Sequence, residues 1–125
     1  MEANKIILLV DDDLTLREMY EERLKAEGFK IVQASNGEEA LAKAKEEKPH
    51  VVLLDIMMPK INGFDVLKTL KADPNTKDVP VIILSALIQD VDRVEGKKLG
   101  AFDYIVKSET MPGEVIEKIK SALKA

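Results

Sequence analysis

Four short apolar runs in this chain each end in polar residues that could take part in chemistry. IILLV is followed by three acids, VVLL by another, VIIL by a hydroxyl and YIV by an ammonium, which are Asp11, Asp12, Asp13, Asp55, Ser85 and Lys107. If the runs are neighbouring strands of a parallel sheet, their carboxyl ends meet at the edge where such sheets bind ligands. The residue types then suggest cation binding and transfer of a charged group.

The acidic residues have two interpretations. Like charges within a few ångströms raise one another's pKa or require a cation, and an all-oxygen site suits Mg²⁺ far better than Zn²⁺. Alternatively, the acids after the first run cap the next helix, where negative charge meets the positive end of the helix dipole. We expect capping mainly of Asp13. We expect a Mg²⁺ site at Asp11, Asp12 and Asp55, because capping accounts for one acid and not three.

Asp55 ends a buried run, so its carboxylate is a candidate nucleophile for a phosphoryl group. The loop after it contains Met57, Pro59 and Gly63, and a Pro and a Gly could hold a main-chain carbonyl toward the metal. An ordinary apolar turn packed on the core is an equally open reading of this loop. Ser85 and Lys107 are the residue types expected around phosphoryl oxygens. Each is common at a strand end, and only their shared position supports the prediction.

Strand-length apolar runs alternate with longer segments of helical period, which predicts βαβ units and one parallel sheet. The first, third and fourth runs are apolar on consecutive residues and should be central strands, whereas KIVQA alternates as an edge strand does. The fold class is therefore α/β, a doubly wound sheet with helices on both faces. Strands are expected near 6–10, 30–34, 51–54, 81–84 and 103–106.

Five helices are expected to connect and follow the strands. Asn36 can cap the second helix while Glu39 closes a capping box. The fourth helix has only Val91, Val94 and Leu99 as apolar anchors, which favours a movable element. The predicted helices are 14–27, 36–48, 64–72, 90–99 and 112–125.

Length, charge and cysteine content narrow the function classes. The 125 residues fit one domain, 1–125, and 19 basic against 23 acidic residues give a formal charge of -4. Without a basic stripe, direct binding of nucleic acid is not expected. The chain has no cysteine, which excludes disulfides, thiolate metal sites and a Cys nucleophile. The first apolar run is too short for a signal peptide, so we expect a cytoplasmic protein without membrane contact.

Four segments appear in the order and spacing of one known family and cover nearly the whole chain: ILLVDDD, LLDIMMPKINGFDVL, VIILSAL and GAFDYIVK. The chain resembles a receiver domain of a two-component response regulator, similar to the single-domain chemotaxis regulators. The resemblance implies a flavodoxin-like (βα)5 fold with five parallel strands in the order 2-1-3-4-5. It also implies a phosphoacceptor signalling switch that catalyses its own phosphorylation and slow dephosphorylation, and not a turnover enzyme.

The resemblance implies a role for each matched residue. Asp55 would accept a phosphoryl group in a Mg²⁺-dependent step from a sensor histidine kinase, a phosphotransfer protein or a small phosphodonor. Asp12 would bind Mg²⁺ directly and Asp11 through water, with Asp55 and the main-chain carbonyl of Met57 in the same metal site. The remaining positions are the switch hydroxyl, the charge partner of the phosphoryl group and the switch aromatic, which correspond to Ser85, Lys107 and Tyr104.

Two positions carry further expectations. The family commonly has a proline after the lysine, often in a cis bond, whereas this chain has Ser108. A cis bond before a non-proline residue costs about 3 kcal/mol, so we expect either a trans bond or a strained loop. Met57 and Leu87 resemble side chains that gate water access to the phosphoryl group, and their apolar bulk predicts slow hydrolysis.

Three other functions compete with the phosphoacceptor switch. An aspartate-nucleophile phosphatase would want a second acid where this chain has Met57. An unphosphorylated interaction module is disfavoured by the intact set of acids, hydroxyl and lysine, and a flavin carrier by the acids that replace its phosphate loop. A downstream protein target is expected on the fourth helix, fifth strand and fifth helix. The sequence leaves open dimerisation on that surface, the cognate kinase, the target and whether the chain belongs to a longer regulator.

Overall fold

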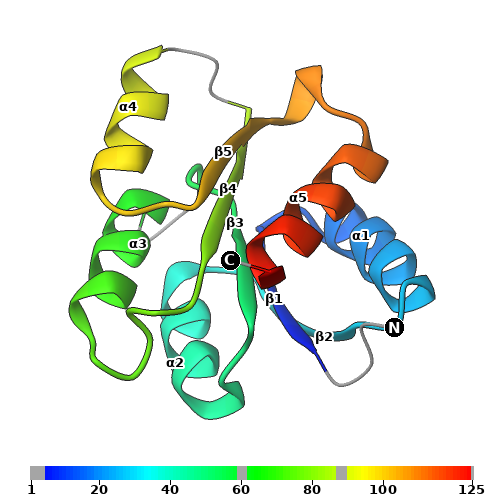
Figure 1. Ribbon diagram of the computed structural model, residues 1–125, viewed down its shortest axis with the longest axis horizontal. Helices are drawn as coiled ribbons and strands as arrows, with labels where there is room; N and C mark the ends of the chain where they lie inside the picture. Colours follow the sequence, from blue (N-terminus) through cyan, green and yellow to red (C-terminus); the bar gives the residue numbers. More distant parts are fainter. Residues whose placement is uncertain (1–4, 59–61, 87–89, 125) are drawn as a thin grey trace.

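The computed structural model describes residues 5–58, 62–86 and 90–124 (Figure 1). The strands are β1 (Ile6–Val10), β2 (Lys30–Ala34), β3 (Val51–Leu54), β4 (Val81–Ser85) and β5 (Asp103–Val106). The helices are α1 (Leu14–Ala26), α2 (Gly37–Glu47), α3 (Gly63–Ala72), α4 (Asp90–Lys98), the short 3-10 helix η1 (Lys107–Glu109) and α5 (Pro112–Lys124). The predicted strands and helices are all confirmed, close to their expected bounds.

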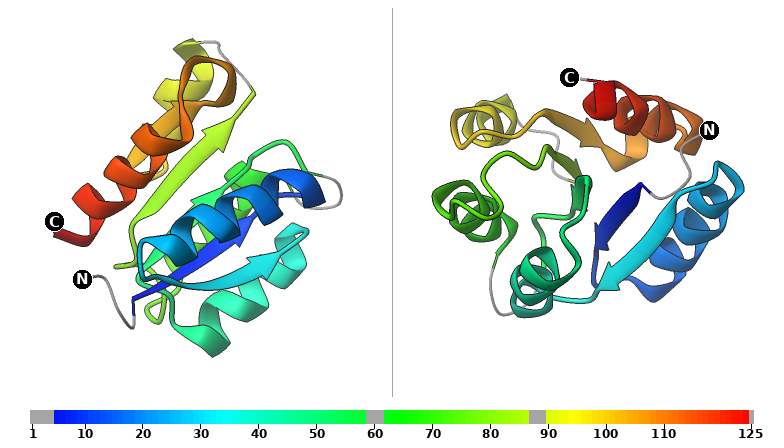
Figure 2. Two further views of the ribbon diagram at one scale, coloured as in Figure 1. Left: turned by 90° about the vertical axis from the view of Figure 1, so that its right-hand side faces the viewer. Right: turned by 60° about the horizontal axis from the view of Figure 1, so that its bottom comes forward.

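The strands form one parallel sheet in the order β2-β1-β3-β4-β5, which confirms the implied topology and the edge position of β2. Because side chains of a strand alternate between its two faces, β1 contributes to two separate cores. Leu8 and Val10 pack with residues of α2 and α3, whereas Ile7 and Leu9 pack with residues of α1 and α5. Figures 1 and 2 show helices on both sides of the sheet. Burial of both faces explains why IILLV lacks polar alternation.

Side-chain caps define where the first two helices begin. Asp13 Oδ1 accepts a hydrogen bond from the backbone N–H of Leu16 at 3.2 Å, and Asn36 Oδ1 accepts one from that of Glu39 at 2.9 Å. The Glu39 carboxylate reaches back to the N–H of Ser35 at 2.6 Å. Each cap satisfies a backbone donor that the helix leaves unpaired, which typically stabilises by about 1 kcal/mol. The cap at Asp13 therefore helps to fix the turn between β1 and α1.

The prediction about the anchors of α4 is wrong for two of its three residues. Val91 and Val94 are 69% and 64% exposed, whereas Leu99 packs against the core as expected. The helix lies on the sheet through buried Gly96, where an added Cβ would stand only 3.2 Å from the Tyr104 ring. Since a helix turns about 100° per residue, Val94 falls on the side opposite Gly96. A glycine thus occupies the inner face and the valines the outer one.

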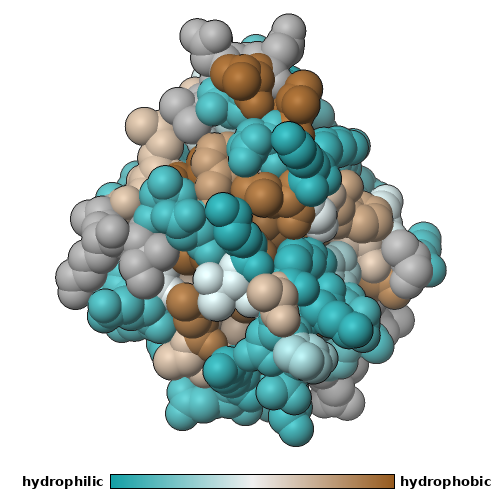
Figure 3. All heavy atoms as spheres, turned by 90° about the vertical axis from the view of Figure 1, so that its left-hand side faces the viewer, coloured by the Kyte–Doolittle hydropathy of each residue, from teal (hydrophilic) through white to brown (hydrophobic). Residues whose placement is uncertain are grey.

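Few of the large apolar side chains that the structure describes are exposed on the surface. Figure 3 views the face formed by α2, α3 and α4, where hydrophilic atoms dominate and brown atoms gather near the top, at the height of α4. Among the described residues, no helix has both the length and the apolar character needed to cross a bilayer. Within the described ranges, the exposed large hydrophobic residues are Leu14, Met57, Val91, Val94 and Met111.

Candidate functional site

The structure brings the predicted site residues to one edge of the sheet. Asp11 and Asp55 directly follow β1 and β3, Ser85 ends β4, and Lys107 directly follows β5. The pairing of β1 with β3 extends past the strands, because the N–H of Asp55 donates to the main-chain oxygen of Val10 at 2.9 Å. Backbone hydrogen bonding between the two strands therefore holds Asp11 and Asp55 side by side.

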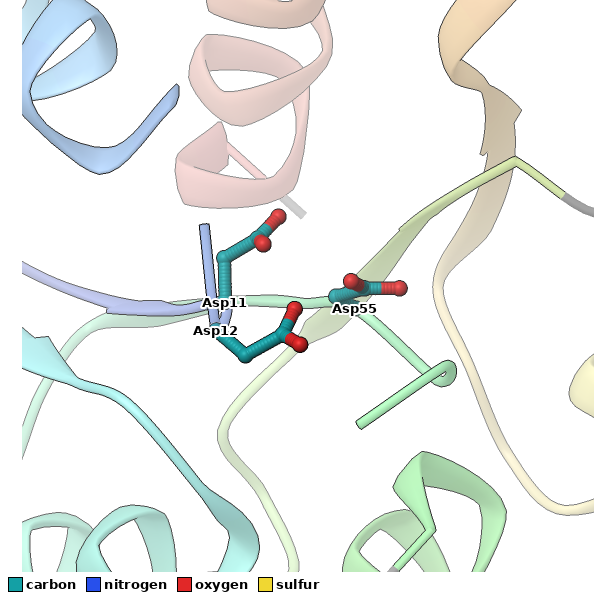
Figure 4. Close-up of side chains that lie close together, drawn as sticks. All are labelled: Asp11, Asp12 and Asp55. Atoms are coloured by element: carbon teal, nitrogen blue, oxygen red, sulfur yellow. The ribbon is translucent and has the colours of Figure 1, made fainter. Parts of the chain in front are cut away.

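Three carboxylates converge at this edge (Figure 4). Asp11, Asp12 and Asp55 each offer an oxygen, and these oxygens all lie within 4.8 Å of one another. Asp11 and Asp55 are buried, whereas Asp12 is exposed. Three acids facing a single lysine leave an excess of negative charge, which a divalent cation would neutralise. The donors are carboxylate oxygens, the ligand type of Mg²⁺ and not of thiolate-bound metals, so the predicted acidic group is confirmed and fits that ion.

The two buried carboxylates make matching hydrogen bonds. Asp11 accepts from the backbone N–H of Asp13 on Oδ1 and from Lys107 Nζ on Oδ2, both at 2.9 Å. Asp55 accepts from the N–H of Met57 on Oδ1 at 2.9 Å and from Lys107 Nζ on Oδ2 at 3.3 Å. One oxygen of each acid is thus fixed by the turn that follows it, and the other by the shared lysine.

Burial and charge shift the pKa values of Asp55 and Lys107. Burial raises the pKa of Asp55, assisted by the charge of Asp11, and outweighs the lowering by the Met57 N–H and by Lys107. Burial pulls the pKa of Lys107 down, but its hydrogen bond to Asp11 and the charges of both acids exceed that effect and raise it. The charged form of Lys107 is therefore stabilised by the two acids. The ionised form of Asp55 is disfavoured by burial and by the charge of Asp11, and an added cation would offset this effect.

The loop after Asp55 depends on Gly63. A Cβ at that residue would lie 2.2 Å from the Cα of Ile56, and the Gly63 N–H donates to the Ile56 main-chain oxygen at 3.0 Å. This close approach of two backbones requires glycine. Both readings of the loop hold in part, because Ile56 and Met58 are buried in the core while the N–H of Met57 contacts Asp55. Pro59 and Leu87 lie outside the described residues.

Ser85 and the aromatic residue Tyr104 are both buried and contact each other. Ser85 is fully buried and Tyr104 is 5% exposed. A side-chain hydrogen bond joins the two residues, and burial is the main cause that raises the pKa of the Tyr104 phenol. The guanidinium of Arg93 lies 6.0 Å from the centre of the Tyr104 ring and pairs with Glu109 at 3.4 Å. The Tyr104 hydroxyl is thus hydrogen-bonded to Ser85, and the guanidinium of Arg93 lies over the ring.

The chain continues from Lys107 without a cis bond. No cis peptide bond occurs within the described ranges, and residues 107–109 form η1 without a positive φ. The trans alternative for the bond before Ser108 is the one found. A strained loop is not needed to accommodate the missing proline.

Sequence reasoning missed the contacts of two arginines, Arg93 and Arg17. Arg17 donates from Nη1 to the main-chain oxygen of Asp11 at 2.8 Å and from Nε to Gln33 at 3.0 Å. The available signal was its position four residues after Asp13, on the first turn of the helix, where side chains point back toward the strand end. An exposed arginine on a solvated helix face has the same sequence pattern, so the contact could not be distinguished in advance.

Comparison with known proteins identifies the family. The sequence model of one protein family, the response regulator receiver domain, matches residues 7–120. The chain is 43% identical to a probable transcriptional regulator, ycf27, of Guillardia theta over 124 residues, 99% of this chain and 47% of that protein. It is 45% identical to protein PilH of Pseudomonas aeruginosa over 103 residues, 81% of this chain and 84% of PilH. The chemotaxis protein CheY4 of Vibrio cholerae superposes with a TM-score of 0.89 at 30% identity, covering 97% of this chain and 100% of CheY4.

The chain belongs to the response regulator receiver domain family, whose members are signalling switches of two-component systems. This family explains the site, because a phosphoacceptor switch requires converging acids, a hydroxyl and a lysine at one sheet edge. Histidine kinases or phosphotransfer proteins are the class of partner that such a domain implies. The chain spans about half the length of the ycf27 relatives it matches. No comparison favours a phosphatase, an unphosphorylated module or a flavin carrier.

Proposed function

We propose that Asp55 is the phosphoacceptor of this receiver domain. The observation that carries this is the environment of its carboxylate, which is 4% exposed, held by the Met57 N–H and Lys107, and next to two further acids. An oxygen lone pair of Asp55 attacks phosphorus, an O–P bond forms, and the P–N bond of a phosphohistidine or the P–O bond of an acyl phosphate breaks. The leaving group keeps the electron pair, and the product is an aspartyl phosphate.

The proposal includes a Mg²⁺ site at Asp11, Asp12 and Asp55 with the main-chain carbonyl of Met57. Three acids and one lysine leave a negative site that would repel a phosphoryl donor, and a bound Mg²⁺ would neutralise charge on the phosphoryl oxygens. Asp12 is the exposed member of the three acids. Asp11 and Asp55 are buried, and each accepts a hydrogen bond from the backbone N–H two residues further along the chain.

Lys107 and Ser85 are proposed to stabilise the phosphoryl group once it is on Asp55. Lys107 already lies within hydrogen-bonding distance of both buried acids, so it can pair with the added negative charge with little movement. Ser85 shares a hydrogen bond with Tyr104. A hydroxyl has one donor and two acceptor positions, so Ser85 can donate to the phosphoryl group while accepting from Tyr104. Tyr104 is thereby the proposed switch aromatic.

The output surface is proposed to be α4, β5 and α5, for a downstream protein target or for dimerisation. Val91 and Val94 of α4 and Met111 before α5 are more than half exposed. The link from Ser85 through Tyr104 to Arg93 joins the site to α4. Phosphorylation would therefore bias a helix that presents apolar side chains to a partner.

The proposal treats residues 1–125 as one receiver domain in the cytoplasm. PilH and CheY4 are matched over most or all of their length, so a receiver domain of this size is found among the similar proteins. Besides accepting phosphate, the domain is proposed to lose it slowly, without turnover of a substrate.

The test is incubation with acetyl phosphate, with and without Mg²⁺, followed by intact-mass measurement. Wild type should gain one phosphoryl group only with Mg²⁺, and Asp55→Asn should gain none. Asp65→Asn, which changes an exposed acid on α3, should behave as wild type. Equal labelling of wild type and Asp55→Asn would overturn the assignment, and repeated turnover of phosphomonoesters would revive the phosphatase.

A further inference from the structure

Every polar group of Asp11 is engaged by another part of the protein. Its N–H donates to the main-chain oxygen of Ala34 at 3.1 Å, and its two carboxylate oxygens accept from Asp13 and Lys107. Its main-chain oxygen accepts from Arg17 Nη1 at 2.8 Å. This last contact orients the peptide group that joins residues 11 and 12, because the carbonyl is part of that planar unit.

Asp12 depends on that peptide for its direction. The exposed Asp12 side chain makes no hydrogen bond or ion pair to another residue in the described parts of the chain. Its carboxylate nevertheless lies close to those of Asp11 and Asp55. Because no side chain holds the Asp12 carboxylate in this position, its direction toward Asp11 and Asp55 is set by the backbone that precedes it.

Arg17 is itself fixed from the opposite side. While Nη1 holds the carbonyl of Asp11, Nε donates to Gln33 Oε1 on β2 at 3.0 Å. The Gln33 amide donates in turn to Glu21 at 2.5 Å, and Lys43 of α2 donates to the Gln33 main-chain oxygen. The guanidinium is planar, so two bonds from different nitrogens fix its orientation. Lysine has a single nitrogen and cannot reproduce this fork.

We propose that Arg17 is a positioning residue for the acidic group, holding the peptide between Asp11 and Asp12 so that Asp12 faces a bound Mg²⁺. This inference rests on the proposed Mg²⁺ site. It differs from a role for Arg17 as a mere counter-charge, because a counter-charge would be kept by lysine whereas the two-sided contact would not.

The first experiment titrates Mg²⁺ into the full chain by calorimetry and compares wild type with Arg17→Lys, Arg17→Met and Gln33→Ala. Both Arg17 variants should bind Mg²⁺ about tenfold more weakly, the usual effect of removing a group that orients a metal ligand. Gln33→Ala leaves Arg17 and its charge in place but removes one of its two contacts, and should weaken binding less. Arg23→Met removes the same charge from an exposed position on α1 and should bind as wild type.

A second measurement follows the backbone amides of residues 12 and 13 by NMR without Mg²⁺. These amides should shift in the Arg17 variants and stay unchanged in Arg23→Met. Wild-type Mg²⁺ affinity in Arg17→Lys together with unmoved amides would overturn the positioning role. If Arg17→Met fails to fold, Arg17→Lys and Gln33→Ala decide the question.

Failure of the proposed function gives a different result. If wild type neither binds Mg²⁺ nor accepts phosphate from acetyl phosphate, the metal site itself is wrong and the inference falls with it. If wild type does both and Arg17→Lys matches it at every Mg²⁺ concentration, only the positioning role is wrong. If Arg17→Lys is labelled to the wild-type level, but only at higher Mg²⁺ concentration, the result supports both the proposed function and the positioning role of Arg17.

Discussion

The ammonium nitrogen of Lys107 lies 3.3 Å from Oδ2 of Asp55, yet the pKa of that carboxyl is raised. The lysine does not offset the loss of water around Asp55 and the neighbouring charge of Asp11. Lys107 also divides its charge between two acids and lies nearer to Asp11, at 2.9 Å. Ionised Asp55, the proposed nucleophile, is therefore destabilised by its surroundings in the fold. This destabilisation favours both cation binding and reaction with phosphorus.

Asp55→Asn is expected to stabilise the protein in the absence of Mg²⁺, by about 1 kcal/mol at neutral pH, the typical size of a single-site effect. The substitution removes a charged group that burial disfavours. Thermal unfolding in the presence of a chelator measures the difference. Glu22→Gln, at an exposed site on α1, is the control and should change stability little.

The stabilisation by Asp55→Asn should depend on pH with a defined sign. The pKa of Asp55 is raised in the folded state above its ordinary value of 3.8, so the folded state binds the proton more tightly than the unfolded chain does. Below pH 3.8 wild type should therefore be little less stable than Asp55→Asn. The difference in stability grows as the pH rises through the raised pKa of Asp55 and is constant above it. Lys107 adds no pH dependence in this range, because the stability gained from its raised pKa is constant below 10.5 and is lost only at higher pH. A deficit that shrinks with rising pH would contradict the prediction.

The strand ends were predictable because parallel β-strands impose one geometry on all of them. Consecutive apolar residues predicted central strands, and the carboxyl ends of central strands share an edge, so Asp11 and Asp55 were expected at the same edge, and close together if β1 and β3 are neighbours. The order of the strands did not follow, because no local pattern says which strand lies beside which. That order came from family resemblance.

Contacts made by long side chains and by glycine could not be predicted in the same way. Arg17 reaches the carbonyl of Asp11 only when α1 has packed on the sheet. Hydrophobic periodicity wrongly predicts Val91 and Val94 as the inner anchors of α4, because it counts side chains, whereas α4 contacts the sheet through Gly96, which has none. Periodicity fails where close backbone approach replaces side-chain burial.

Gly63→Ala should destabilise the protein by about 1–3 kcal/mol, the usual cost of overpacking, and should also slow phosphorylation. The new methyl group would meet the Cα of Ile56 at 2.2 Å, and backbone atoms cannot turn aside as a flexible side chain can. Shifting that loop moves the Met57 N–H away from Asp55. Urea unfolding measures the first effect and acetyl phosphate labelling the second.

Gly113→Ala is the matched control, because nothing lies within 4 Å of a Cβ at that position in α5. Alanine is favoured over glycine in helices by up to about 1 kcal/mol, so this variant should be as stable as wild type or more so. Equal loss of stability in both glycine variants would show that the contact with Ile56 is not the cause.

Met57→Ser is expected to speed loss of phosphate from Asp55 by about tenfold, a lowering of the barrier by roughly 1.4 kcal/mol. The Met57 side chain is 51% exposed on the loop that contacts Asp55, and a short hydroxyl would admit and bind a water that the thioether excludes. The decay of the phosphorylated species is followed by intact mass after the donor is removed. Met111→Ser changes an equally flexible, exposed methionine elsewhere and should decay as wild type. An unchanged rate in Met57→Ser would refute the gating role.

The amides of α4 should exchange with solvent at least about tenfold faster than those of α1, a difference of roughly 1.4 kcal/mol in opening free energy. Helix α1 buries Tyr20 and Leu24, whereas Val91 and Val94 of α4 face solvent. The contacts of Arg93 with Tyr104 and Glu109 help to hold α4. Arg93→Met should therefore raise exchange further in α4 and leave α1 unchanged, as measured by hydrogen exchange with mass spectrometry. Equal protection of the two helices in wild type would show that α4 is anchored as firmly as α1, and would remove the physical basis for treating it as the movable element.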